Sequence, residues 1–419
     1  MEAARSAEQA ARRSYGKLVA WLTARCGDPA AAEDALSEAF LAALADWPRQ
    51  GVPRSPEAWL LVTARRRWLD GHRRTRTQER LLPLLLEEAF TMPTDPSAGA
   101  GETAAIPDDR LRLLFLCAHP AIDAAIQAPL MLQTVLGLNA ARIGAAFLVA
   151  PAAMGQRLVR AKAKIREARI PFVLPPAHAL PARAEAVHQA IYAAFGTGWE
   201  EPGAAGGSDG LAQEAVQLAR LCVELLPQEP EGRGLLALLL HAQARRPARR
   251  DRHGAYVPLQ GQDMRLWSRP LQAEAEAELR QAEAEAELRQ AAAQGRMGRF
   301  QLEAAIQSVH AQRAVHGRVD WPALLHLYDG LIRLAPSLGA QVSRLAVLAE
   351  LRGAAAGLEP LEALGASVPA TASYQPWWAL RAELLSRLGR WPEARESYGR
   401  AIALTTDPAA LAFLRGRCP

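Results

Sequence analysis

Apolar residues recur at intervals of three and four along almost the whole chain, and alternating strand-like runs are nearly absent. Alanine, leucine, arginine and glutamate, which dominate the sequence, are good helix formers. This spacing indicates helices with one buried face, so we predict an all-α protein. No apolar run reaches the roughly 18 residues that a membrane span needs, and the start lacks the apolar stretch of a signal peptide. We therefore expect a cytoplasmic protein without a membrane partner.

Proline and glycine divide this helical sequence into blocks. The segment 81–106, which ends in a run rich in proline, glycine and threonine, is predicted to be a linker. One helical block, 10–80, precedes it, and a second block, 107–171, follows it. The remainder, 180–419, is predicted to be a succession of helix pairs. Asp108 and Asp109 are interpreted as N-terminal caps of the helix that opens the second block.

The stretch WLLVTARRRWLDGHRR, residues 59–74, holds five arginines and one histidine against a single aspartate. On a helix with about 100° per residue, apolar and basic residues separate onto opposite faces. The apolar face carries Leu61, Ala64 and Trp68, and the basic face carries Arg66, Arg67, Arg73 and Arg74. One aspartate cannot neutralise so many arginines, which favours a polyanionic partner over a merely solvated surface helix.

The distribution of charge supports this interpretation. Residues 1–175 carry 23 Lys and Arg against 18 Asp and Glu, whereas the rest of the chain carries 26 of each. The net charge of +5 therefore falls in the N-terminal part, where polyanion binding is expected. The four cysteines form no CxxC pair, and we predict neither a metal site nor a cofactor. The sequence contains no HExxH, Walker or GxSxG motif, so an enzyme is not expected.

Residues 139–170 predict two short helices joined by a three-residue turn. Asn139 is a good N-cap for the first helix, and Pro151 suits the first turn of the second. The second helix has an apolar stripe of Met154, Leu158, Ala161 and Ile165. Beside the stripe lies a polar face of Gln156, Arg157, Arg160 and Lys164, and Lys162 flanks its other side. Two such helices are typical of a helix-turn-helix, whose second helix enters the major groove.

Two further patterns lie in the C-terminal half. Residues 378–408 have the spacing of a 34-residue tetratricopeptide unit, carried by Trp378, Ala382, Leu385, Gly389, Trp391, Ala394, Tyr398 and Ala401. We expect an irregular α-solenoid that binds a protein partner, or equally a helical domain without one. A nine-residue unit occurs twice at 272–290. Nine residues turn a helix by about 900°, so the two copies present opposite faces, and we interpret this helix as exposed.

The two basic stretches, their order and the linker between them resemble an extracytoplasmic-function (group 4) sigma factor of bacterial RNA polymerase. Region 2 of that family is similar to the carboxylate-rich 27–47 and to 59–74, which match at Trp59, Leu60, Ala64, Arg65, Asp70, Arg73 and Arg74. Region 4 is similar to 107–170. The phrases IPDDRLRLLFLCAHPA and RRPARRDRHGAYVPLQGQDMRLW resemble a subgroup with a long C-terminal tetratricopeptide-like domain. The chain departs from the family pattern at Arg66, Trp68, Arg142 and Gly155.

The resemblance implies a function and a set of site residues. Region 2 would dock on the clamp helices of the largest polymerase subunit through Asp34, Glu38 and Leu41, and region 4 would dock on the flap of the second-largest subunit. Minus-ten promoter DNA would be bound by Trp59, Arg65, Arg66, Arg67, Asp70, Arg73 and Arg74. Minus-thirty-five DNA would be bound by Gln156, Arg157, Arg160, Lys162 and Lys164. The C-terminal domain would support sigma activity, with an unknown protein or the chain's own sigma domains as its partner.

The alternative is a free-standing helix-turn-helix transcriptional regulator with a tetratricopeptide-like sensing domain. Such a protein would bind duplex DNA tightly without polymerase, usually as a dimer on paired half-sites. A repressor has no use for two separate DNA-binding blocks joined by a linker. The acidic helix at 28–46, followed by the basic helix, therefore favours the sigma factor.

Overall fold

A computed structural model of the 419-residue chain describes residues 2–75, 109–147, 149–176, 179–200, 208–291 and 297–419. Within these ranges it contains 18 α-helices and no β-strand, which confirms the predicted all-α class. None of the described helices is long and apolar enough to cross a membrane. The predicted linker at 81–106 lies outside the described residues. The chain divides into two compact units, residues 1–222 and 223–419.

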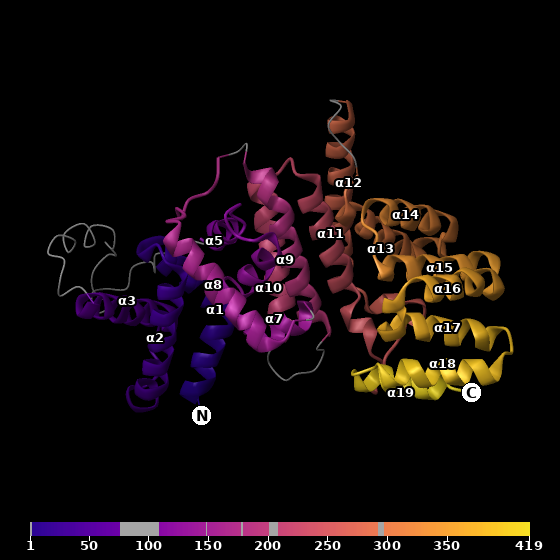
Figure 1. The fold of residues 1–419 in the computed structure, drawn as a ribbon, viewed down its shortest axis with the longest axis horizontal. Coiled ribbons are helices and arrows are strands. Elements are labelled where there is room, and N and C mark those ends of the chain that lie inside the picture. The colour runs from indigo at the N-terminus through magenta and orange to yellow at the C-terminus, as the bar shows by residue number, and fades with distance from the viewer. Residues whose placement is uncertain (1, 76–108, 148, 177–178, 201–207, 292–296) are drawn as a thin grey trace. The chain divides into compact units, whose positions relative to one another are not determined.

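The first unit contains two helical blocks that follow one another along the chain (Figure 1). The helices of the first block are α1 (Glu2–Cys26), α2 (Pro29–Gln50) and α3 (Pro56–Thr75). The later helices are α5 (Arg110–Cys117), α6 (Ala124–Thr134), α7 (Ala140–Phe147), α8 (Pro151–Glu167), α9 (Leu180–Glu200) and α10 (Ser208–Leu225). In the first block α1, α2 and α3 all pack on one another. In the second block α7 packs on α8, and α9, which begins beyond residue 171, packs on α6.

Helix caps in this unit test the expectations drawn from the sequence. Asn139 caps α7 as predicted, because its Oδ1 accepts a hydrogen bond from the backbone N–H of Arg142 at 2.9 Å. Asp109 occupies the N-cap position of α5 but accepts no backbone hydrogen bond there. Its backbone is not extended, so the carboxylate pairs with Arg112 at 3.1 Å instead, and the predicted capping bond is wrong. Asp108 lies outside the described residues.

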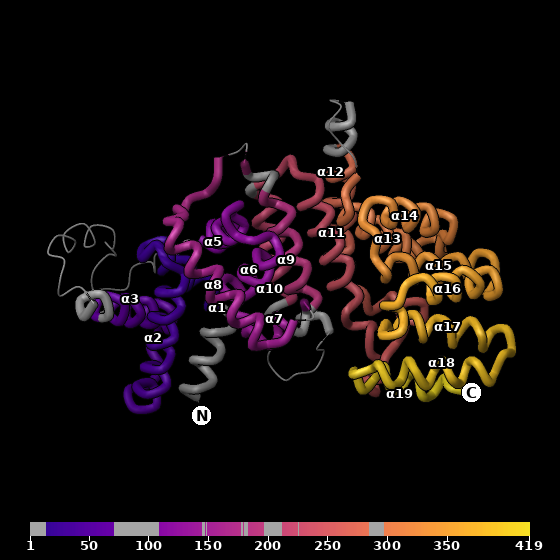
Figure 2. Tube along the Cα trace, viewed as in Figure 1, coloured from indigo at the N-terminus to yellow at the C-terminus, as the bar shows by residue number. Residues whose placement is uncertain are grey.

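The second unit is a succession of helices, each packed on the next (Figure 2). They are α11 (Pro230–Ala244), α12 (Arg269–Ala291), α13 (Arg299–His316), α14 (Trp321–Leu334), α15 (Leu338–Arg352), α16 (Ala354–Ser367), α17 (Gln375–Arg387), α18 (Trp391–Ala403) and α19 (Pro408–Arg417). Short 3-10 helices lie at Arg246–Arg249, Leu259–Gly261, Met264–Leu266 and Pro369–Ser373. The sequence-predicted helix pair at 378–401 corresponds to α17 and α18, which bury Ala382, Ala394, Tyr398 and Ala401. Its assignment to a tetratricopeptide repeat stays a prediction.

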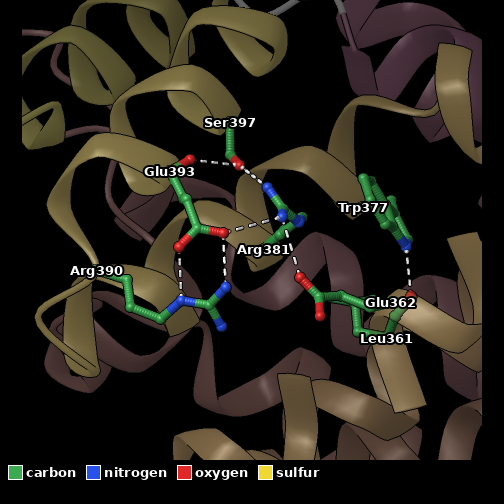
Figure 3. Close-up of polar contacts among 7 residues, drawn as sticks. All are labelled: Leu361, Glu362, Trp377, Arg381, Arg390, Glu393 and Ser397. Atoms are coloured by element: carbon green, nitrogen blue, oxygen red, sulfur yellow. Dashed lines mark hydrogen bonds and ion pairs between the residues drawn. The ribbon is translucent and has the colours of Figure 1, made fainter. Parts of the chain in front are cut away.

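A polar network joins α16, α17 and α18 (Figure 3). The guanidinium of Arg381 donates to Ser397 Oγ at 2.7 Å and to Glu362 Oε1 at 3.0 Å. It also lies 3.8 Å from Glu393 Oε2, which Arg390 binds at 2.6 Å. Because the Arg381 side chain is only 16% exposed, these partners compensate a largely desolvated charge.

The repeated nine-residue unit forms α12, and the expectation of an exposed helix is wrong. The helix packs on α11 and buries Ala275, Leu279 and Ala282. The two copies do present opposite faces, because Ala273 of the first copy is exposed while its equivalent in the second copy, Ala282, is buried. One buried stripe is therefore assembled from different positions of the two copies.

Candidate nucleic-acid and polymerase interface

Helix α3 carries the basic stretch, and its two faces differ as the sequence predicts. Its apolar residues face α1 and α2 and are buried: Leu60, Leu61, Ala64 and Trp68. Arg66, Arg67 and Asp70 are exposed. The helix begins at Pro56, where a missing N–H removes no hydrogen bond and the fixed φ suits a first turn. Helix α3 therefore presents cationic side chains to solvent from a packed apolar base.

Other members of the predicted minus-ten set are less exposed. Trp59 packs edge-on against Trp47, with ring centroids 5.5 Å apart, and is half-buried. Arg65 is also half-buried and lines a small cavity together with Trp68. The last two members, Arg73 and Arg74, belong to α3 by their backbone. Their side chains lie outside the described part of the structure. The exposed part of the predicted set thus centres on Arg66, Arg67 and Asp70.

Helix α8 matches the predicted second helix of a helix-turn-helix in its bounds and in its buried stripe. It begins at Pro151, and its buried residues include the predicted Met154, Leu158, Ala161 and Ile165. The polar face is exposed and consists of Gln156, Arg157, Arg160 and Lys164. Because these side chains project from a helix that is anchored along its other side, they can reach an external ligand without unfolding it.

Lys162 differs from the other predicted members of the α8 set, because it is buried. Its ammonium pairs with a carboxylate oxygen of Glu33 on α2, and the two side chains are 10% and 14% exposed. Burial raises the pKa of Glu33, and the nearby Lys162 acts in the opposite direction. Lys162 therefore faces α2 here, away from the exposed basic face, and its predicted contact with DNA stays a prediction.

Helix α2 holds the predicted polymerase-binding residues. Asp28 caps it by accepting a hydrogen bond from the N–H of Ala30 at 2.9 Å. One face of the helix is buried in the first block, and Asp34, Glu38 and Leu41 are exposed, Leu41 by 67%. The sequence interpretation missed Leu44, which is 47% exposed one turn beyond Leu41. Its signal was the three-residue spacing from Leu41, which gives two exposed leucines on an otherwise acidic surface.

The second unit offers a different kind of surface. A groove of about 550 Å³ lies between α14, α15 and α16. Ile332, Leu345 and Leu364 contribute apolar lining, and Arg344 lines it while paired with Asp329 at 2.6 Å. Among the described residues, no group of three or more His, Cys, Asp or Glu side chains is placed to hold a metal ion.

Comparison with known proteins assigns the first block. Residues 11–78 match a family described as Sigma-70 region 2, and residues 183–283 match one described as a family of unknown function (DUF6596). The chain is 40% identical over 385 residues to an uncharacterized protein of Rhizobium meliloti (strain 1021), an alignment that covers 92% of this chain and 88% of the relative. The chain belongs to the same family as that protein. No solved structure matches the chain.

The sigma-70 region 2 implies that the chain acts as a sigma factor in transcription initiation, with core RNA polymerase and promoter DNA as partners. Sigma factors are not enzymes. The matched range contains the whole of α2 and α3, and hence every residue of the predicted minus-ten and polymerase-binding sets.

Proposed function

We propose that this chain is a sigma factor of the extracytoplasmic-function type, which directs core RNA polymerase to specific promoters. The observation that carries the proposal is the pair of exposed faces within residues 11–78. Arg66 and Arg67 on α3 form a cationic face, and Asp34, Glu38 and Leu41 on α2 form an acidic and apolar face. A sigma factor needs both, one for DNA and one for the polymerase.

On this proposal α3 binds the minus-ten element. Phosphates attract the arginines, and a half-buried aromatic side chain, Trp59, can stack on a base that leaves the duplex. Arg65 and Asp70 lie on the same helix, and Arg73 and Arg74 extend the set to its end. Opening a DNA duplex requires cations that hold the phosphates and an aromatic ring that stacks on an unpaired base. This combination therefore suits a helix that helps to open DNA.

Helices α7 and α8 are proposed to form the region 4 helix-turn-helix, within the block 107–171. Arg157, Arg160 and Gln156 would reach base edges in the major groove, and Lys164 would contact the backbone. The exposed polar face of α8 supports this assignment, as does the N-cap that separates α7 from the preceding turn.

The C-terminal region, 180–419, is proposed to be a tetratricopeptide-like domain that supports the activity of the sigma blocks. Successive packed helix pairs with small buried residues, such as Ala382 and Ala394, support this proposal. On this proposal α2 binds the clamp helices of the largest polymerase subunit, and the 107–171 block binds the flap of the second-largest subunit.

Run-off transcription with core polymerase on a genomic promoter library tests the proposal. The full-length chain should yield transcripts that depend on it, and Leu41→Lys should abolish them by placing a charge in an apolar contact. Ala314→Lys, at an exposed position of α13, is the matched control and should leave transcription unchanged. Specific duplex binding without polymerase, combined with no transcripts, would instead identify a free-standing regulator.

A further inference from the structure

Two arginines occupy equivalent positions in successive helix pairs of the second unit. Arg344 lies on α15, which packs on α16, and Arg381 lies on α17, which packs on α18. The two arginines are 37 residues apart, and the same offset relates the buried Gly357 of α16 to the buried Ala394 of α18. The two helix pairs therefore share one register. The surroundings of Arg381 show which groups satisfy a guanidinium at this position.

The chain itself satisfies Arg381 (Figure 3). Its guanidinium donates to Glu362 on the preceding helix, α16, and to Ser397 on the following helix, α18. A second carboxylate, that of Glu393 on α18, lies 3.8 Å from it. Two carboxylates and a hydroxyl therefore compensate one largely desolvated cation.

Arg344 has poorer surroundings at the equivalent position. The preceding helix, α14, supplies one carboxylate, because Asp329 Oδ1 accepts a hydrogen bond from the Nε of Arg344 at 2.6 Å. On α16, however, Ala356 and Pro360 occupy the positions at which α18 has its carboxylate and its hydroxyl. Neither side chain has a polar atom. In the described part of the chain Nη1 and Nη2 of Arg344 have no hydrogen-bond partner, and its side chain is 32% exposed, against 16% for Arg381.

This incomplete position opens into the groove of about 550 Å³ between α14, α15 and α16. Arg344 and Pro360 both line the groove. A second guanidinium, that of Arg333, also lines it and forms no ion pair with any described residue. Asp329 is the one carboxylate among the described lining residues, so two cations face a single anion. The remaining wall is mainly apolar and includes Ile332, Leu345, Ala363 and Leu364.

We propose that the groove binds a small molecule that joins a carboxylate to an apolar body, such as a medium-chain fatty acid. The carboxylate would supply the charge that α16 lacks, because the two Nη groups of Arg344 form a fork that matches two carboxylate oxygens. Arg333 would add a second positive charge, and the apolar body would lie against Ile332 and Leu364. A groove of this volume falls within the usual range of small-molecule sites, about 300–1,000 Å³.

A small molecule is favoured over a protein because the missing groups amount to one carboxylate and one side chain. The inference goes beyond the proposed function, since it assigns a ligand site to the second unit and involves neither DNA nor polymerase.

Isothermal titration calorimetry of the full-length chain with sodium decanoate, below the concentration at which it forms micelles, tests the site. One decanoate should bind per chain. The alcohol 1-decanol has the same body without the charge, and acetate has the charge without the body. Each should bind about tenfold more weakly or worse, since one charged hydrogen bond or a few buried methylenes correspond to at least that factor.

Ala356→Glu tests the role of Arg344, because it supplies the missing carboxylate from the chain itself. The new side chain should pair with Arg344 as Glu393 pairs with Arg381. The affinity for decanoate should then fall about tenfold or more. Ala355→Glu is the matched control, because it adds the same charge at an exposed position about 100° around the helix, and it should keep the wild-type affinity.

Ala363→Phe tests the apolar half of the site. Ala363 is exposed and lines the groove, so a phenyl ring at this position occupies the groove while the buried core stays unchanged. Decanoate binding should be lost, and urea unfolding should match the wild type. Ala366→Phe, at an exposed position of α16 outside the groove lining, is the matched control and should bind decanoate normally.

Three results would overturn the inference. They are the absence of saturable decanoate binding, equal affinities for decanoate and 1-decanol, and unchanged decanoate affinity in Ala356→Glu. An acetylated and amidated peptide of two leucines and a glutamate is titrated in parallel. Tighter binding of this peptide than of decanoate would assign the groove to a protein partner instead and would also overturn the inference. None of these measurements uses polymerase, so a chain that binds decanoate but yields no transcripts would contradict the sigma-factor proposal alone.

Discussion

Replacing Arg66 and Arg67 together with alanine should flatten the salt dependence of promoter binding by the polymerase complex. Both side chains are exposed on α3, so their removal leaves its buried face unchanged. Each phosphate contact releases counterions and adds about 0.9 to the slope of log affinity against log salt concentration. Two lost contacts therefore lower the slope by about 1.8. Between ~50 and ~200 mM salt, the affinity advantage of the wild type should shrink about twelvefold.

The assay is a titration of fluorescent promoter DNA with the reconstituted complex at four or more salt concentrations. The control variant, Arg318→Ala with Arg352→Ala, removes the same formal charge from exposed positions of the second unit. It should keep the wild-type slope. Equal slopes for the Arg66–Arg67 variant and the wild type would refute phosphate contacts by these residues, whatever the change in absolute affinity.

Three further predictions concern other parts of the chain. Changing Arg157 or Arg160 to alanine should relax the base preference at the upstream element, at about 1–3 kcal/mol per bidentate contact, and an unaltered preference in promoter selection would remove them from the reading helix. Burial lowers the pKa of His188 to about 4, so this histidine is protonated in the unfolded chain at pH 5 but not in the folded one. Its contribution to the free energy of unfolding should therefore fall by about 2 kcal/mol between pH 7.5 and pH 5. Urea unfolding of His188→Gln should lack this loss. Arg381→Ala should destabilise the second unit by about 2 kcal/mol, because it removes the cation that pairs with Glu362 and lies beside Glu393, whereas the more exposed Arg387→Ala should cost under about 1 kcal/mol; equal midpoint shifts would contradict the network's role.

Local sequence signals predicted the helices of the candidate site well. The N-cap at Asn139, the position of Pro151 and the apolar stripe of α8 are all observed. Each depends on interactions within about one turn of helix or on a repeat of three and four residues. A short stretch of sequence therefore contains everything needed to predict these features.

Errors arose where a residue's environment depends on a distant helix or on the detailed backbone conformation of a turn. The repeat of α12 gave no indication that α11 would cover it, because facing partners are not encoded in the repeat itself. Asp109 has the right residue type for a cap, but the backbone conformation turned its carboxylate toward Arg112. Leu44 lies three residues after Leu41, but this spacing alone did not show that both leucines stay exposed in the packed block.

The sequence alone determined the all-α class, the basic face of α3, the polar face of α8 and the acidic face of α2, because helical periodicity assigns residues to faces. Only the tertiary structure decided which of those faces meet. Lys162 has the same charge as Lys164 and lies two residues away, yet one is buried against Glu33 and the other is exposed. A rotation of about 200° along the helix separates them, and the first block lies on one side only. The contact between the two blocks joins residues far apart in the sequence, so only the tertiary structure shows it.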